Sequence, residues 1–220
     1  MMSIMHSSSA LPAQRKTVCS YPRILWLIRV LFQGGFRLAG WTFSTQPPAE
    51  RKYVMVVAPH TSNWDFFLMV GLGAALGRQA RFMVKDSVFV GPLGSLMRWL
   101  GGISVDRGSQ NNVVQQMTDT FAGTDDMVLI IAPEGTRKAV PRWKGGFYHI
   151  AAGAQVPVVP VFLDYGRKEV GFGEPCQPSG DLDADMPVIQ QCYADVTACH
   201  PEGDSSHPAK LSLSAADVGN

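Results

Sequence analysis

The sequence predicts an α/β domain built on a mixed, largely parallel sheet flanked by helices. From residue 53 onward, short apolar runs alternate with stretches that have helical periodicity. Repeated strand–helix alternation is typical of this fold class. The length of 220 residues fits a single domain with a substantial core, and no internal repeat or linker divides the chain.

The apolar runs predict strands, and the stretches between them predict helices. A strand at 53–58 is followed by a helix at 64–76, for which Ser62 or Asn63 provides the N-cap. The remaining strands are expected at 81–84, 103–106, 127–132, 156–163 and 168–171. The remaining helices are expected at 94–100, 111–121, 145–152 and, with a weaker pattern, 183–196.

The two ends of the chain lack this alternation. Residues 1–20 are rich in Ser, Ala, Met and Gln without periodicity, which predicts a disordered leader. Residues 201–220 are predicted to form a flexible tail. The folded domain is therefore expected to cover residues 45–200, with a separate helical segment at 21–44 before it.

The segment 21–44 has the pattern of a helix that lies in a membrane interface. At about 100° per residue, Arg23, Arg29, Gln33 and Arg37 fall within one sector of about 120°, and apolar side chains cover most of the rest. Two alternatives stay open: a core helix whose arginines extend to solvent, and a membrane span, which the internal arginines disfavour. A cleavable signal peptide is not expected, because no small-residue cleavage site follows a short apolar run.

Charge and cysteine content narrow the range of partners. The formal net charge is +1, so the composition gives no indication of nucleic-acid binding. The four cysteines, Cys19, Cys176, Cys192 and Cys199, lack the short paired spacing of a zinc site and are expected to be reduced thiols. The sequence predicts no metal site.

A histidine and an aspartate follow the first predicted strand, in the segment PHTSNWD at 59–65. Residues five apart on a regular helix point about 140° away from each other, so His60 and Asp65 meet only if His60 lies in the loop and Asp65 in the first helical turn. Pro59 and the capping residues favour that arrangement. Asp65 would then orient one ring nitrogen of His60 and leave the other to take a proton. The spacing alone also fits a structural histidine before a helix.

A second polar segment, APEGTR at 132–137, also follows a predicted strand. Gly135 permits a tight turn, Thr136 and Arg137 can donate hydrogen bonds, and an arginine binds a phosphate with two donors. Glu134 could hold Arg137 or a substrate hydroxyl. A surface turn with an exposed salt bridge is the alternative. Together the two segments indicate an enzyme that activates a hydroxyl on a phosphate-bearing substrate, and the absence of GxxxxGK[ST] disfavours nucleotide hydrolysis.

These segments resemble the lysophospholipid and glycerolipid acyltransferases related to bacterial 1-acylglycerol-3-phosphate acyltransferase. The HxxxxD block matches at 60–65, and a glycine followed by Val-Asp-Arg matches at 102–107. Pro-Glu-Gly-Thr-Arg matches at 133–137, and a Val-Pro-Val-Val-Pro-Val strand matches at 156–161. Lys85 and Pro92 also occur where the family usually has a lysine and a proline. The four blocks occur in the family's order, and this makes the resemblance specific.

The resemblance implies an O-acyltransferase of phospholipid biosynthesis and a role for each block. His60 would be the general base that deprotonates the acceptor hydroxyl, and Asp65 would orient it. The phosphate or other polar headgroup of the acceptor would be held by Arg107, Glu134, Gly135, Thr136 and Arg137, and Pro160 would shape the substrate cleft. The hydroxyl would attack the acyl thioester directly, since no GxSxG nucleophile elbow is present.

The implied substrates place the protein at a membrane. The acyl donor would be acyl-CoA or acyl-carrier protein, used as a co-substrate without any cofactor. The expected acceptor is a lysolipid, most specifically 1-acylglycerol-3-phosphate, and a lyso-aminolipid fits the same blocks. Because such an acceptor lies among membrane lipids and the donor comes from the cytosol, a peripheral or monotopic position on the cytoplasmic face of the inner membrane is expected.

The chain departs from the family pattern at two positions near the predicted site. Ala132 replaces a common aromatic residue, and Lys138 replaces a common serine. Beyond Arg167 the chain matches no family motif. Two other function classes remain as hypotheses: a hydrolase in which His60 activates water, and a non-catalytic membrane lipid-binding protein. Product release without an acceptor would indicate the first, and function that survives His60→Ala would indicate the second.

Overall fold

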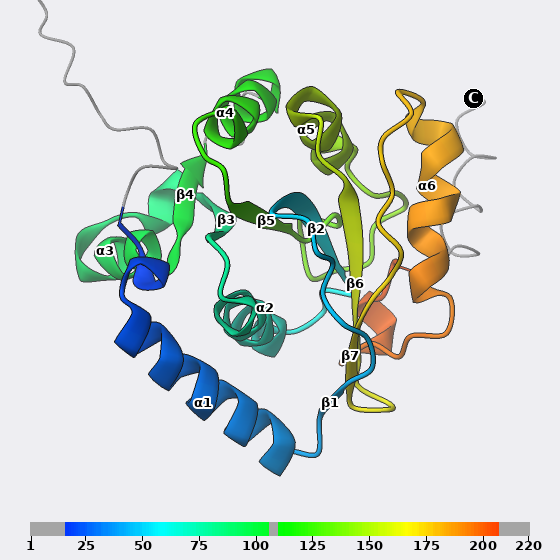
Figure 1. Ribbon diagram of the computed structural model, residues 1–220. Coiled ribbons are helices and arrows are strands. Elements are labelled where there is room, and N and C mark those ends of the chain that lie inside the picture. Colours follow the sequence, from blue (N-terminus) through cyan, green and yellow to red (C-terminus); the bar gives the residue numbers. More distant parts are fainter. Residues whose placement is uncertain (1–15, 106–109, 207–220) are drawn as a thin grey trace, which may run out of the picture.

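The chain forms one seven-stranded sheet with helices on both faces (Figure 1). The computed structural model describes residues 16–105 and 110–206. The strands are β1 (Thr42–Phe43), β2 (Lys52–Ala58), β3 (Ala80–Lys85), β4 (Gly102–Val105), β5 (Met127–Ile131), β6 (Val158–Asp164) and β7 (Glu169–Phe172). The helices are α1 (Pro22–Leu38), α2 (Asn63–Leu76), α3 (Gly91–Leu100), α4 (Gln110–Ala122), α5 (Gly146–Ala154) and α6 (Leu182–Gln190).

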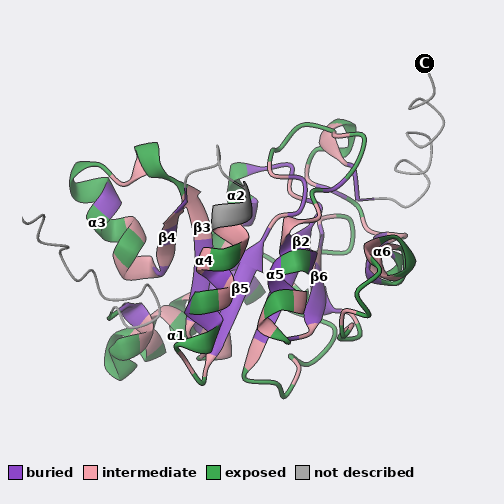
Figure 2. Cartoon of the chain, turned by 90° about the horizontal axis from the view of Figure 1, so that it is seen from above, coloured by how far each residue is buried: buried purple, intermediate pink, exposed green. Residues whose placement is uncertain are grey.

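The sheet has the strand order β1-β7-β6-β2-β5-β3-β4. Among the strand pairs of the described residues, β6 and β7 run antiparallel and all others run parallel. This confirms the predicted mixed, largely parallel sheet. Strands β2 and β5 lie side by side in the middle, where both faces of the sheet are covered (Figure 2).

Two hydrophobic cores lie on opposite faces of the sheet. Helices α1 and α2 cover one face, and α4, α5 and α6 cover the other (Figure 1). Alternate residues of β2 enter the two cores, because successive side chains of a strand point to opposite faces. Tyr53, Met55 and Val57 pack on the α1–α2 side, and Val54, Val56 and Ala58 pack on the α4–α5 side. Burial on both faces explains why this strand is a continuous apolar run.

Helix α1 packs one stripe of side chains on the domain and turns another outward. Phe36 is buried, and the Phe32 ring lies so close to Gly71 of α2 that a Cβ there would be 2.1 Å from a ring carbon. On the outer face, Trp26 and Leu31 are each 65% exposed and Leu38 is 91% exposed. The helix therefore has features of both a core helix and an interfacial one. Among the described residues, no helix is long and apolar enough to cross a bilayer.

The helix predicted for the segment 21–44 is too long at its C-terminal end. Helix α1 stops at Leu38, Gly40 follows with a φ of 81°, and Thr42 and Phe43 form β1 against β7. Positive φ values favour glycine, so Gly40 provides the turn out of the helix. Pro187 lies inside the last helix, which is also shorter than predicted and passes into a short 3₁₀ turn at Gln191–Tyr193.

Both predicted disordered ends are partly wrong. In the leader predicted at 1–20, Val18–Ser20 form a 3₁₀ turn and Thr17 is only 1% exposed. In the tail predicted at 201–220, Pro201–Gly203 form another 3₁₀ turn and Ser206 is fully buried. Tertiary contacts hold these polar segments in place, which a pattern of composition does not indicate. The rest of both predictions, residues 1–15 and 207–220, lies outside the described residues.

Candidate active site

The two polar segments meet at the carboxyl ends of neighbouring strands. His60 follows β2, and the loop at 132–137 follows β5, which pairs with β2 in parallel. Helices α2 and α5, which follow these strands, run along opposite faces of the sheet (Figure 1). Loops that diverge to opposite faces leave a crevice at the strand ends, which is where open α/β sheets bind ligands.

Asp65 lies in the first turn of α2 and His60 in the preceding loop, as the spacing predicted. Ser62 is the N-cap of the helix, and its hydroxyl accepts a hydrogen bond from Trp64 N at 3.1 Å. Asp65 Oδ2 accepts from the main-chain N–H groups of Thr61 at 2.8 Å and Ser62 at 2.7 Å. The helix start is therefore a capping box in which Asp65 is the acidic member.

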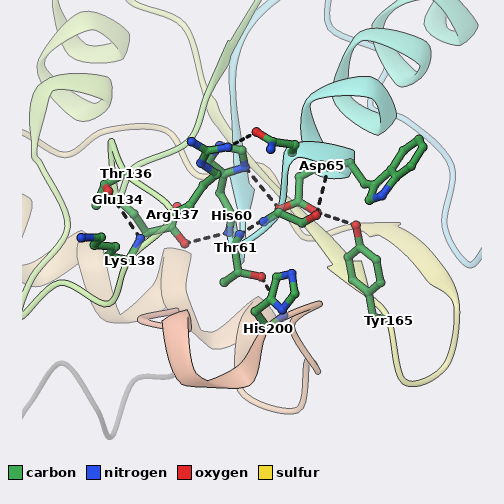
Figure 3. A network of polar contacts seen from close by, with 12 residues as sticks. His60, Thr61, Asp65, Glu134, Thr136, Arg137, Lys138, Tyr165 and His200 are labelled. Carbon is green, nitrogen blue, oxygen red and sulfur yellow. Dashed lines mark hydrogen bonds and ion pairs between the residues drawn. The ribbon is translucent and has the colours of Figure 1, made fainter.

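The same carboxylate faces the histidine ring (Figure 3). His60 Nδ1 lies 3.3 Å from Asp65 Oδ2, and the His60 side chain keeps 17% of its surface exposed while Asp65 is fully buried. Burial alone would raise the pKa of Asp65, but the contact with His60 and the hydrogen bonds it accepts hold its pKa below the ordinary value. Asp65 is thus a carboxylate at neutral pH. Its negative charge faces Nδ1 and favours the N–H on that nitrogen, which leaves Nε2 as the nitrogen to accept a proton.

Glu134 turns inward and joins the two loops. Its side chain is 2% exposed, and Oε1 accepts a hydrogen bond from the main-chain N–H of His60 at 3.0 Å. Oε2 is buried without a hydrogen-bond partner in the described part of the chain. Burial raises the pKa of Glu134 to about 7. The sequence left Glu134 to hold either Arg137 or a substrate group, whereas the structure turns it toward the His60 loop.

The rest of this loop is open to solvent and rich in donors. Gly135 has a φ of 65°, and a Cβ there would come within 3.1 Å of Lys144 Nζ. Thr136 and Arg137 are exposed, and the Arg137 guanidinium donates to the Asn63 side chain at the start of α2 (Figure 3). Arg137 is therefore held beside the helix terminus that carries Asp65. A guanidinium and a helix N-terminus together favour an anion.

Two predicted site residues remain, Arg107 and Pro160. Arg107 lies outside the described residues. Pro160 is buried within β6 opposite Val56, four residues before His60 in the neighbouring strand, and its carbonyl accepts from Gly173 N. It is therefore part of the sheet beneath the site.

Tyr193 is a residue of this region that the sequence did not single out. Its hydroxyl donates to Val56 O at 2.7 Å and accepts from Val161 N at 3.2 Å. Val54 N donates to Pro157 O, and in this parallel register a regular ladder would also join Val161 N to Val56 O. The phenol is inserted between β2 and β6 just below the His60 loop.

Tyr165 and the segment at 197–206 were also missed. Tyr165 directly follows β6, and its hydroxyl donates to Asp65 Oδ1 at 2.6 Å (Figure 3). His200 N donates to Thr61 Oγ1 at 3.0 Å, and Tyr165 N donates to Thr197 O at 2.8 Å. A polar residue at the end of a strand next to β2 could have indicated Tyr165, but no local pattern indicates the later segment.

The described residues contain no cluster of three or more His, Cys, Asp or Glu side chains placed to bind a metal ion. The functional groups of the site are instead an imidazole backed by a carboxylate, a buried acid and a donor-rich loop. This set can remove a proton from a hydroxyl and bind an anionic group beside it.

Comparison with known proteins assigns the family. Residues 41–164 match the model of the family described as Acyltransferase, which covers more than half of the chain. The chain belongs to the acyltransferase family. The match includes the four blocks from which the resemblance was predicted, and so confirms it.

The names of several relatives of this acyltransferase chain include the lipid that the relative acylates. It is 31% identical to human 1-acyl-sn-glycerol-3-phosphate acyltransferase alpha over 67% of this chain and 54% of the relative. It is 30% identical to the human beta enzyme over 73% of this chain and 63% of the relative, and 31% identical to Drosophila melanogaster lysophosphatidylcholine acyltransferase over 54% and 22%. The chain thus spans about half the length of the human alpha enzyme.

A solved structure has the same fold. The 1-acyl-sn-glycerophosphate (LPA) acyltransferase PlsC from Thermotoga maritima superimposes with a TM-score of 0.52. The match covers 81% of this chain and 83% of that one at 17% sequence identity. At this identity the likeness supports the architecture of the acyltransferase chain, namely a largely parallel sheet flanked by helices.

Proposed function

We propose that this protein transfers an acyl group from an acyl thioester to a hydroxyl of a lysolipid, with 1-acylglycerol-3-phosphate as the acceptor, in phospholipid biosynthesis. The main support is the contact of His60 Nδ1 with the buried Asp65 carboxylate, beside a loop that presents Arg137. Family membership supports the reaction class, and the names of several relatives support the acceptor.

The chemistry follows from the position of the two ring nitrogens. Nε2 of His60 takes the proton of the acceptor hydroxyl as its oxygen attacks the thioester carbonyl. The negative charge of Asp65 stabilises the imidazolium that forms. The tetrahedral intermediate then expels the thiolate, which takes the proton from His60. An ester and a free thiol result, and the base returns to its neutral form. A positioned base of this kind contributes roughly 10²–10⁴-fold in rate.

The loop after β5 supplies the acceptor site in this proposal. Thr136 and Arg137 are exposed donors beside the start of α2 and bind the phosphate there. Gly135 leaves the space through which Lys144 approaches the loop. Glu134 holds the His60 loop from beneath, and we expect it to position His60 more than to contact the headgroup. Arg107 keeps its proposed role at the headgroup, and the surroundings of Pro160 form the floor of the cleft.

The proposal places the protein at a membrane surface. The outward stripe of α1, with Trp26, Leu31 and Leu38, enters the lipid interface, and Arg23 and Arg37 meet the headgroups. The lysolipid reaches the site from this surface, and acyl-CoA or acyl-carrier protein arrives from solution as the co-substrate. The cytoplasmic face of the inner membrane offers both substrates.

The test is thioester consumption by the purified chain with lysolipid-containing vesicles. Acyl-CoA and acyl-carrier protein are each supplied with and without 1-acylglycerol-3-phosphate, a lyso-aminolipid or lysophosphatidylcholine, beside the His60→Ala variant. Product that depends on 1-acylglycerol-3-phosphate and disappears in the variant supports the proposal. Fatty acid released without an acceptor would indicate a hydrolase. Lipid binding that is unaffected by His60→Ala, without turnover, would indicate the non-catalytic alternative.

A further inference from the structure

The Asp65 carboxylate accepts a third hydrogen bond that the family blocks do not contain. Tyr165 lies in the turn between β6 and β7, outside all four blocks, and its hydroxyl donates to Oδ1 of Asp65 at 2.6 Å. The other carboxylate oxygen, Oδ2, accepts from Thr61 N and Ser62 N and faces His60. Oδ2 therefore contacts the helix cap and the His60 ring, and Oδ1 contacts Tyr165 (Figure 3).

The Tyr165 hydroxyl acts as a permanent donor to this carboxylate. Burial and the hydrogen bond to Asp65 both raise the pKa of Tyr165 above its usual value, so the phenol keeps its proton at neutral pH. The Cys199 thiol is a second titratable group beside the hydroxyl. A hydrogen bond from a neutral phenol to a charged, buried carboxylate is short and strong.

The ring of Tyr165 is fixed by contacts that lead back to α1. Trp41 meets it edge to face, with ring centroids 5.0 Å apart and planes at 87°. The Trp41 ring in turn contacts that of Phe36, the buried residue of α1, with centroids 5.3 Å apart, and the main-chain N–H of Trp41 donates to Phe36 O at 2.9 Å. A continuous series of aromatic side chains thus joins the N-terminal helix to Asp65.

We infer that Tyr165 is a positioning residue of the active site: its hydroxyl fixes the Asp65 carboxylate toward His60, and Trp41 fixes Tyr165. This inference rests on the proposed function for its kinetic consequences. Tyr165 touches Asp65 and not the reacting atoms, so it acts on the rate of the chemical step through the orientation and charge of the carboxylate.

The test compares Tyr165→Phe with a matched control in the same chain. Tyr148→Phe is the control, because the Tyr148 hydroxyl donates to Asp185 at the same 2.6 Å, but on α5 and α6, outside the site. For Tyr165→Phe we expect kcat to fall roughly ten-fold or more with little change in either KM, because the carboxylate is no longer held in the orientation in which it faces the His60 ring. For Tyr148→Phe we expect an unchanged kcat.

A second readout separates positioning from general loosening. With one hydrogen bond fewer, the Asp65 carboxylate attracts the imidazolium proton more strongly, so the acid limb of the pH profile of kcat/KM should move to higher pH in Tyr165→Phe. The ring resonances of His60, followed by NMR in histidine-labelled protein, should titrate at correspondingly higher pH. Neither quantity should move in Tyr148→Phe.

The NMR titration needs no turnover, so it decides on Tyr165 even if the proposed function fails. A His60 titration that is the same in wild type and Tyr165→Phe would overturn the inference, whether or not kcat falls. An unchanged kcat in an active enzyme would overturn it as well, and would leave the proposed function intact.

The link to Trp41 is tested by a double-mutant cycle. If Trp41 acts through Tyr165, Trp41→Leu should lower kcat in the wild type and add little in the Tyr165→Phe background. Effects on kcat that are fully additive would show that Trp41 acts elsewhere and would overturn this part of the inference.

Discussion

The main-chain N–H of His60 donates a hydrogen bond to Oε1 of the buried Glu134, and this contact joins the loops after β2 and β5. The two residues are 74 positions apart in the chain. The contact places the candidate base next to an acid whose pKa is raised by burial to about 7. One hydrogen bond therefore connects the two predicted blocks, and the burial of its acceptor Glu134 makes the stability depend on pH.

Glu134→Gln should flatten the pH dependence of stability. Because the pKa rises from 4.5 to about 7 on folding, the native state binds more protons than the unfolded chain between these values. Wild-type stability therefore falls as the pH rises through this window, by an amount on the order of 3 kcal/mol. Glutamine keeps an oxygen for the His60 N–H but does not ionise. Urea unfolding of both proteins from pH 4.5 to 8 measures the difference, and parallel curves would contradict the prediction.

Asp65→Asn and Ser62→Ala should separate the capping role of the helix start from its catalytic role. Ser62→Ala removes a cap hydrogen bond and should lower the free energy of unfolding by about 1 kcal/mol while each folded molecule keeps its turnover. Asp65→Asn removes the negative charge that faces His60 and stabilises its imidazolium, and should lower kcat by roughly 10²–10⁴-fold. Thermal unfolding and thioester assays on both variants check this. Similar losses of kcat in the two variants would show that the helix start, and not the charge, governs turnover.

Arg137→Ala should raise KM for a phosphate-bearing lysolipid more than for a neutral one. The guanidinium lies beside the start of α2, where its positive charge and its paired N–H donors can both bind a phosphate. Lys138→Ala is the matched control, because Lys138 is also exposed and adjacent in the chain. KM values for 1-acylglycerol-3-phosphate and for a monoacylglycerol, which carries no phosphate, measure the effect. Equal changes for the two acceptors would remove the phosphate assignment.

Substitutions on the outward stripe of α1 should weaken vesicle binding, and substitutions on its packed stripe should lower stability. The double variant Trp26→Ala/Leu31→Ala changes two side chains that are each 65% exposed, so we expect little change in stability. It should weaken vesicle binding at least ten-fold, because burying a large apolar side chain in the lipid interface contributes roughly 1.5–3 kcal/mol. Phe32→Ala removes the ring packed on Gly71 and should instead lower stability by about 3 kcal/mol or more. Vesicle sedimentation and thermal unfolding separate the two effects. A double variant that still sediments fully would contradict interfacial binding.

Local contacts account for what the sequence predicted well. His60 and Asp65 are joined within one loop and one helical turn, and a capping box depends on residues three apart. The alternation of apolar runs and helical stretches indicated the class of sheet, and the position of both blocks after strands indicated that they share an edge. These features depend on the chemistry of neighbouring residues, which the sequence presents directly.

The sequence by itself determined the α/β class, the parallel strands and the His60–Asp65 pair. Only the tertiary structure decided that Glu134 holds the His60 loop, that the Tyr193 hydroxyl is inserted between β2 and β6, and that Tyr165 contacts Asp65 across 100 residues of chain. The physical reason is that these contacts depend on the order of strands in the sheet. Strand order brings distant residues together through cooperative packing of the whole core, and no local pattern encodes which partner a side chain will meet.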